Sequence, residues 1–349
     1  MYLPLTDEER RTFAAWRKAD AANQRYLRLV CAYLNHEPRL LTPALINELT
    51  TDTGADEHTA VCAALSAAFG LEDEREEDRL LDRVYLPASV ILPDPAAYRA
   101  NPYFATVEVP RRTCGPWSFT TQSYAPYEGF VCGPLRRGRG GEEMPPLGFF
   151  REEFSFPSVM QDGLEWMAVK PNEVETMRAP LAAARGRVLT FGLGMGYFAF
   201  MASRKAEVTA VTVVERDARV IRLFREYLLP QFPHRDKITV VEADAFEYIR
   251  TTLPHDSHDF AFADIWRDTS DGFPLYRRFL RALRPFSRMA CAYWIEDLFL
   301  SRLRSDRLAA LARADGPTPD ARVTIAPGGL CAAFTDTALR LAAQEEYDD

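Results

Sequence analysis

The chain has 349 residues, of which 47% are hydrophobic and 12% aromatic, so its length favours two domains, or one large domain with an extension. The net charge of −8, with no long basic run outside residues 136–139, disfavours a nucleic-acid partner. Dispersed cysteines without Cys/His metal spacing, no signal-peptide pattern and no apolar run near the ~18 residues of a membrane span favour a cytoplasmic protein with reduced thiols, no metal site and no membrane partner.

Residues 1–85 carry the pattern of a helical N-terminal domain. Thr6-Asp-Glu-Glu resembles a capping box, and apolar residues follow at helical spacing. A helix-turn-helix within residues 45–71 is an alternative, but residues 1–85 contain 10 Lys and Arg against 16 Asp and Glu, and negative charge repels phosphate. We therefore expect a lid, or a homodimer interface formed by the N-terminal helices.

Residues 86–150 are rich in proline, glycine and aromatic residues, which indicates a connector that packs across the following sheet. Within it, Asn101-Pro-Tyr-Phe favours a short strand or turn, and residues 133–146 favour a mobile loop. Residues 154–169 then predict a hairpin turning at Asp162-Gly163, and a helix begins at Pro171. Residues 151–349 are expected to form the second domain.

The most informative segment is a buried-strand pattern at 187–191 that ends in glycines at 192, 194 and 196. Glycines at this place allow a tight turn and close approach of a ligand to the backbone. A dinucleotide-binding fingerprint would require glycine at position 197, where this chain has Tyr197. The spacing therefore disfavours a dinucleotide-binding turn.

Three further strand patterns, at 208–215, 238–244 and 259–266, end at or beside Glu215, Asp244 and Asp264. In open α/β sheets the carboxyl ends of parallel strands form the ligand-binding edge, and an acid about 20 residues after the glycine turn can bind ribose hydroxyls. Acids at strand ends can also cap the next helix, and this alternative stays open for Asp244 and Asp264.

The C-terminal stretch 322–335 favours two strands joined by a Pro-Gly-Gly turn, a connection short enough only for an antiparallel hairpin. With the glycine pattern and the acids, residues from about 150 to 337 resemble the class I S-adenosylmethionine-dependent methyltransferase superfamily. The order of hairpin, helix and glycine strand, with Ala243-Asp244-Ala, resembles its spermidine synthase branch. The resemblance implies an α/β fold: a seven-stranded Rossmann-like sheet with an antiparallel last strand.

The same resemblance implies that S-adenosyl-L-methionine binds at the glycine turn and at the first two acids, and that Asp264 is a base or an acceptor anchor. Aromatic and acidic residues beyond strands four and five would contact a small, perhaps cationic, acceptor, although the tryptophans could instead be core packing. The expected cofactor-binding residues are Gly192, Gly194, Gly196, Glu215, Asp244 and Ala245, and the expected substrate residues are Trp266, Trp294 and Glu296.

These residues predict a methyltransferase, and two alternatives remain. In spermidine synthases a second acid typically follows the first by three residues, whereas Asp268 follows Asp264 by four. An aminopropyltransferase would also need acids near the glycine turn to hold a decarboxylated donor, and the local sequence there is apolar. The other alternative is a non-catalytic regulatory protein that kept the fold.

Overall fold

The computed structural model describes residues 5–314 and 329–345. Contacts divide these residues into two compact units that alternate along the chain. The helical unit comprises 5–92, 127–149, 297–314 and 329–345, and the sheet unit comprises 93–126 and 150–296. Each unit is therefore built from separate stretches of the chain.

The helical unit begins with α1 (Asp7–His36), which has the predicted capping box: Thr6 and Glu9 each bond the other's backbone N–H. Its core gathers aromatic and aliphatic side chains around Tyr26 and Tyr85. The remaining elements of this unit are α2 (Pro43–Thr53), α3 (Glu57–Ala68), α4 (Glu76–Leu80), η1 (Leu81–Tyr85), α5 (Leu86–Ser89), β1 (Val90–Ile91), β4 (Gly129–Val131), β5 (Arg136–Arg137), β6 (Glu143–Met144), β7 (Leu147–Phe149), most of α14 (Glu296–Ala314), α15 (Gly329–Ala333) and α16 (Asp336–Glu345).

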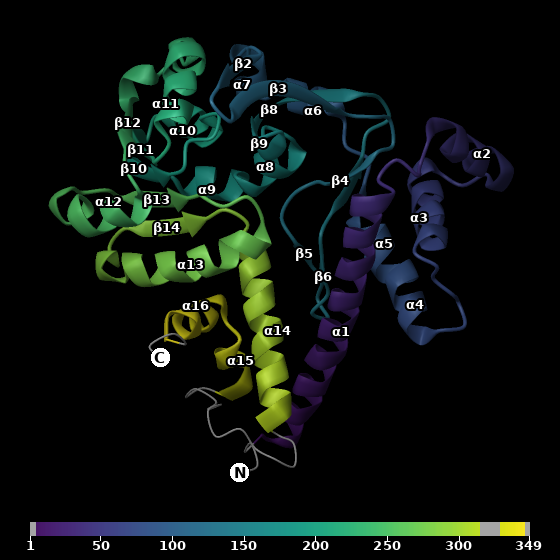
Figure 1. Cartoon of the computed structure of the whole chain (residues 1–349). Coiled ribbons are helices and arrows are strands. Elements are labelled where there is room, and N and C mark those ends of the chain that lie inside the picture. The colour runs from purple at the N-terminus through teal and green to yellow at the C-terminus, as the bar shows by residue number, and fades with distance from the viewer. Residues whose placement is uncertain (1–4, 315–328, 346–349) are drawn as a thin grey trace. The chain divides into compact units, whose positions relative to one another are not determined.

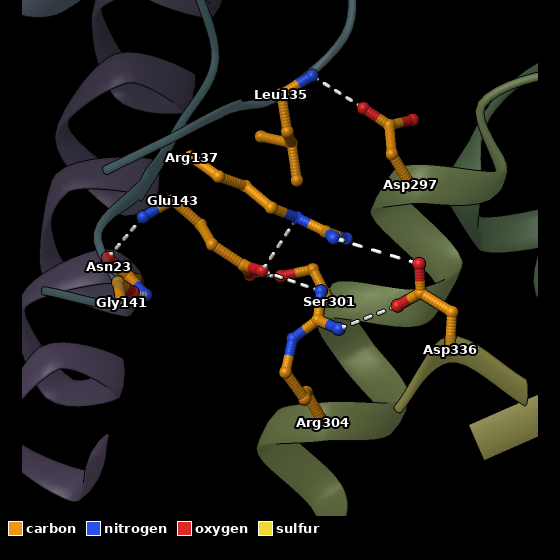
Figure 2. A network of polar contacts seen from close by, with 9 residues as sticks. All are labelled: Asn23, Leu135, Arg137, Gly141, Glu143, Asp297, Ser301, Arg304 and Asp336. Carbon is orange, nitrogen blue, oxygen red and sulfur yellow. Dashed lines mark hydrogen bonds and ion pairs between the residues drawn. The ribbon is translucent and has the colours of Figure 1, made fainter. Parts of the chain in front are cut away.

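An ionic network joins the short β5–β6 ribbon to α14 and α16 within the helical unit (Figure 2). Glu143 contacts Arg304 at 2.6 Å and Arg137 at 3.3 Å, and Asp336 contacts Arg304 at 3.2 Å. Ser301 donates a further hydrogen bond to Glu143. Residues 133–146, which the sequence favours as a mobile loop, thus contain a two-stranded ribbon that forms ion pairs with α14 and α16.

The sheet unit contains a five-stranded parallel sheet in the order β12-β11-β10-β13-β14. The glycine strand lies in its centre, and the strands predicted from the sequence are confirmed as β10 to β13. Their bounds are β10 (Gly186–Phe191), β11 (Val208–Glu215), β12 (Ile238–Glu242), β13 (Phe260–Ala263) and β14 (Ala290–Tyr293). Because strand order reverses beside the central strand, a crevice forms at the carboxyl edge there.

Alternating side chains of these strands bury both faces of the sheet. On one face Phe262 stacks on Phe198 of α10 (Tyr197–Ser203), with ring centroids 4.2 Å apart. On the other face Phe191 packs against Phe279 of α13 (Thr269–Leu283) at 5.3 Å. Helices α10 and α13 accordingly lie on opposite sides of the sheet (Figure 1).

The predicted antiparallel hairpin near the C-terminus is wrong in its second half. Its first strand, at 322–326, lies outside the described residues, but from Gly329 the chain forms α15 and α16. Leu330, Ala333 and Phe334 follow helical spacing and pack with Phe13 and Leu311, which an extended strand could not do with the same three side chains. Over the described residues the main sheet therefore has five strands, all parallel, rather than seven.

A second, antiparallel sheet of order β2-β3-β8-β9 belongs to the sheet unit. Its predicted hairpin is confirmed, because Asp162 and Gly163 both have positive φ, 51° and 81°, as a two-residue turn requires. The other elements are β2 (Arg112–Cys114), β3 (Trp117–Tyr124), β8 (Phe154–Gln161), β9 (Leu164–Ala168), α6 (Pro95–Arg99), α7 (Pro102–Thr106), α8 (Pro171–Thr176), α9 (Arg178–Ala183), α11 (Ala218–Leu223), η2 (Phe224–Leu228), η3 (Leu229–Gln231), η4 (Arg235–Lys237), α12 (Ala245–Thr251), η5 (Leu253–His255) and η6 (Arg284–Phe286). None of the helices described combines the length and apolarity that crossing a bilayer requires.

Candidate active site

The glycine turn connects β10 to α10 and has a backbone conformation that residues with side chains rarely adopt. Gly192 has φ +97°, and a Cβ there would lie 1.9 Å from the carbonyl oxygen of Asp264. Gly196 has φ +74°, and its Cβ would lie 2.4 Å from the ring of Phe224. Gly192 therefore permits contact between two strand ends, and Gly196 permits close packing of the helix after β11.

A cavity of about 260 Å³ lies within the sheet unit, around the glycine turn and the carboxyl edge of the parallel strands. It brings together eight of the residues predicted from the sequence. These are Gly192, Gly194, Glu215, Asp244, Ala245, Asp264, Trp266 and Trp294. Pockets of this kind at the strand-order switch of an α/β sheet are the usual ligand sites of such folds.

Two predicted residues do not line this cavity. Gly196 supports the turn through its packing against Phe224. Glu296 follows Ile295, whose φ is +51°, and its carboxylate accepts a hydrogen bond from the Tyr276 hydroxyl at 2.8 Å. A role for Gly196 or Glu296 in ligand contact remains a prediction.

The acids at the end of β11 and just after β12 accept hydrogen bonds from backbone N–H groups. Glu215 accepts hydrogen bonds from Leu193 N at 3.2 Å and from Asp217 N at 2.9 Å, although burial raises its pKa. Asp244 accepts from Phe246 N at 2.9 Å and so caps α12 as well as lining the cavity. Asp244 therefore both caps a helix and lies at the cavity.

Asp264 has a different environment, because it does not cap α13. That helix is capped by Asp268 and Asp271. Asp264 extends the ladder through its backbone N–H to Phe191 O at 2.9 Å, and its side chain lines the cavity. Burial raises its pKa to about 7, so the carboxyl group gains and loses its proton near neutral pH.

A second carboxyl group, which the sequence did not single out, lines the same cavity. Glu173 lies in the first turn of α8 and is only 5% exposed. Burial and the neighbouring charge of Asp264 raise its pKa well above the ordinary value, while Lys170 lowers it. Lys170 itself forms an ion pair with Glu165, which also accepts a hydrogen bond from Gln122 at 2.7 Å. The two cavity acids thus lie in one site, where the positive charge of Lys170 offsets their negative charge only in part.

A hydroxyl group completes this end of the cavity. Thr190 is 2% exposed and lines the cavity, and among the described residues no hydrogen-bond partner reaches its Oγ1. A buried hydroxyl without a protein partner is uncommon and fits a polar ligand atom. The arginines that line the cavity, Arg216 and Arg278, are both exposed, and Arg278 lies 3.7 Å above the ring of Phe246.

Aromatic side chains form much of the remaining wall. Trp117 and Trp166 meet edge to face with centroids 5.7 Å apart, and Trp294 donates to Thr176 Oγ1 at 3.0 Å. Trp266 is 2% exposed and also packs on Phe279, so it serves the core as well as the cavity lining. Among the residues that the structure covers, no cluster of His, Cys, Asp and Glu is arranged to hold a metal ion.

No family model matches the chain, and no curated protein matches it. Among solved structures, a spermidine synthase in complex with the transition state analogue AdoDATO is 18% identical with a TM-score of 0.32, and the match covers 43% of this chain and 54% of that one. Spermidine synthase from Thermotoga maritima is 16% identical with a TM-score of 0.33, covering 57% and 72% of the two chains. An O-methyltransferase structure from Klebsiella pneumoniae is 19% identical with a TM-score of 0.26, covering 40% and 65%. Both kinds of neighbour have the class I methyltransferase fold.

Proposed function

We propose that this chain is a transferase that binds S-adenosyl-L-methionine in the cavity and transfers its methyl group to a small, cationic or amine-bearing acceptor. The observation that carries the proposal is that the glycine turn, Glu215 and the Asp244–Ala245 pair line one cavity at the strand-order switch. The residues fit such a donor, because the buried Thr190 hydroxyl lines the cavity and has no hydrogen-bond partner among the described residues.

In this proposal each lining group has a separate task. Glu215 would accept hydrogen bonds from ribose hydroxyls, and Asp244 with Ala245 would face the adenine. When bound, the donor supplies an electrophilic carbon beside a positively charged sulfur. Asp264 in its ionised form would stabilise this charge, and Asp264 would take the proton that the acceptor loses, since its pKa of about 7 suits a base near neutral pH. The tryptophans would exclude water and favour a cationic acceptor.

Aminopropyl transfer from decarboxylated S-adenosylmethionine is the second candidate, and Glu173 favours it. The local sequence around the glycine turn is apolar, but α8 brings a buried acid into the cavity from elsewhere in the chain. Two carboxyl groups suit a donor that ends in an ammonium group, whereas the carboxylate of S-adenosylmethionine would need a cation or backbone donors.

Calorimetric titration with S-adenosylmethionine, decarboxylated S-adenosylmethionine and S-adenosylhomocysteine tests these candidates. Tighter binding of the first and third than of the second supports methyl transfer, and the reverse order supports aminopropyl transfer. Binding of none contradicts both candidates and favours a non-catalytic protein. Turnover is then sought with the preferred donor and a panel of small primary and secondary amines.

A matched pair of variants separates specific binding from general charge effects. Glu215→Gln should weaken whichever donor binds, because Glu215 lines the cavity. Glu242→Gln should leave affinity unchanged, because Glu242 pairs with Glu215 across the two strands but is exposed and outside the cavity lining.

A further inference from the structure

The Asn101-Pro-Tyr103 segment makes two hydrogen bonds to the glycine turn and its helix. The Tyr103 hydroxyl donates to the carbonyl oxygen of Met195 at 2.8 Å, in the middle of the turn. Asn101 caps α7 with its Oδ1 and uses its Nδ2 to donate to the Tyr197 hydroxyl at 2.9 Å. A residue pair about 90 positions away in sequence therefore fixes the turn on which the proposed donor would rest.

The contact at Tyr103 is sealed from water. Tyr103 is fully buried, and its ring packs edge to face on Phe200 at 5.3 Å and on Phe232 at 6.3 Å. Burial raises the pKa of the Tyr103 hydroxyl, so it remains a neutral hydrogen-bond donor over the physiological pH range. Without this donor the Met195 carbonyl would be a buried acceptor lacking its partner, which is a costly state.

The chain after Tyr103 goes on to bond two more segments of the sheet unit. Glu108 exchanges backbone hydrogen bonds with the Gln231 side chain, at 2.9 Å and 2.8 Å. Trp117 donates from its indole to Asp217 at 2.9 Å, and Asp217 caps α11 and lines the cavity. Residues 101–117 thus reach the glycine turn, the η3 turn and the loop after Glu215.

We propose that residues 101–117, here called the strap, are a positioning element that holds the glycine turn and the loop after Glu215, which line the donor cavity, and the η3 turn in their binding arrangement. The proposal rests on the proposed function only in assuming that the bound molecule contacts the glycine turn. Fixing the turn before binding lowers the ordering cost that a ligand must offset. Tyr103 acts through the Met195 carbonyl and does not itself line the cavity.

Two variants and one control test the strap. Tyr103→Phe removes only the hydroxyl, and Gln231→Ala removes the bonds to Glu108, while neither residue lines the cavity. Tyr33→Phe is the matched control, because the Tyr33 hydroxyl also donates to a backbone carbonyl, that of Pro38 at 3.2 Å, in the helical unit. The measurements are donor affinity by calorimetry, hydrogen–deuterium exchange of the amides at 192–197, and melting temperature.

We expect Tyr103→Phe to weaken donor binding about tenfold and to speed exchange at 192–197, with a smaller effect for Gln231→Ala. Tyr33→Phe should leave donor affinity and amide exchange at 192–197 at the wild-type level, even if its melting temperature is lower. Unchanged exchange at the turn in Tyr103→Phe, or equal losses of affinity in Tyr103→Phe and Tyr33→Phe, would overturn the proposal. If the wild-type chain binds no donor, the proposed function fails, and the exchange data alone decide on the strap.

Discussion

Glu143 in the helical unit is a partly buried acid and Glu173 in the sheet unit a buried one, and their surroundings differ. The side chain of Glu143 is 11% exposed and contacts two arginines, which together with Asp336 balance the local charge (Figure 2). Glu173 is 5% exposed and faces another acid, Asp264, with the nearby Lys170 already paired to Glu165. An acid with its cations in place holds a structure together, whereas an acid pair short of cations fits a site where a ligand brings the positive charge.

The largest expected effect comes from removing the proposed base, Asp264. With an amine that supports turnover, Asp264→Asn should lower kcat by about 100- to 10,000-fold, because an amide cannot take up the acceptor's proton. Glu143→Gln should leave kcat unchanged in the same assay. A modest loss in Asp264→Asn, within a few-fold of wild type, would remove the proposed base and leave Asp264 a binding residue only.

Charge removal in the helical unit should cost stability instead. Glu143→Gln removes the carboxylate that pairs with Arg137 and Arg304. We therefore expect a loss of about 2 kcal/mol in the free energy of unfolding. Chemical denaturation at neutral pH measures this loss. A stability equal to that of wild type would show that the network is a surface arrangement without energetic weight.

The opposite sign is expected for Glu173→Gln. Because the folded-state pKa of Glu173 is raised, the folded chain keeps a proton that the unfolded chain has released, and stability falls as pH rises above the ordinary value of 4.5. The variant should therefore be more stable than wild type at pH 8, by about 1 kcal/mol, and similar at pH 5. Lower stability than wild type at pH 8 would mean that Lys170 fully compensates this acid.

The smallest effect concerns the pH dependence of binding. Asp264 gains its negative charge as pH rises through about 7, so a donor with a positive sulfur should bind several-fold tighter at pH 8 than at pH 6. S-adenosylhomocysteine, whose sulfur is neutral, should show a weaker dependence in the same titrations. Equal pH profiles for the two molecules would show that the charge of Asp264 does not act on the sulfur of the donor.

Local sequence patterns predicted the parts of this site that local physics determines. The strand patterns, the glycines and the acids at Glu215 and Asp244 lie where strand periodicity and the turn place them. Glu173 was missed because a glutamate in the first turn of a helix is ordinary, and only the packing of α8 brings it to Asp264. The contact between Tyr103 and Met195, also a matter of packing, has no local signal.

Backbone geometry places one predicted residue outside the cavity lining and turns one predicted strand into a helix. Glu296 follows a strand end as expected, but the positive φ of Ile295 precedes it, and its carboxylate bonds Tyr276. The apolar residues from Leu330 onward satisfy both strand and helix patterns, and burial against α1 and α14 favours the helix. Short apolar segments of this kind are ambiguous until their partners are known.

The alternation of the two units along the chain has a consequence for how the protein can be cut and made. Residues 93–126 belong to the sheet unit, but the chain leaves it for residues 127–149 before returning. A fragment starting at residue 150 would retain every strand of the five-stranded parallel sheet yet lose Tyr103 and Trp117, so we expect it to be insoluble or to lack a formed cavity. During synthesis, likewise, neither unit can finish folding before residue 296 has been added to the chain. The first residues of each unit therefore lack part of their packing partners until late in synthesis.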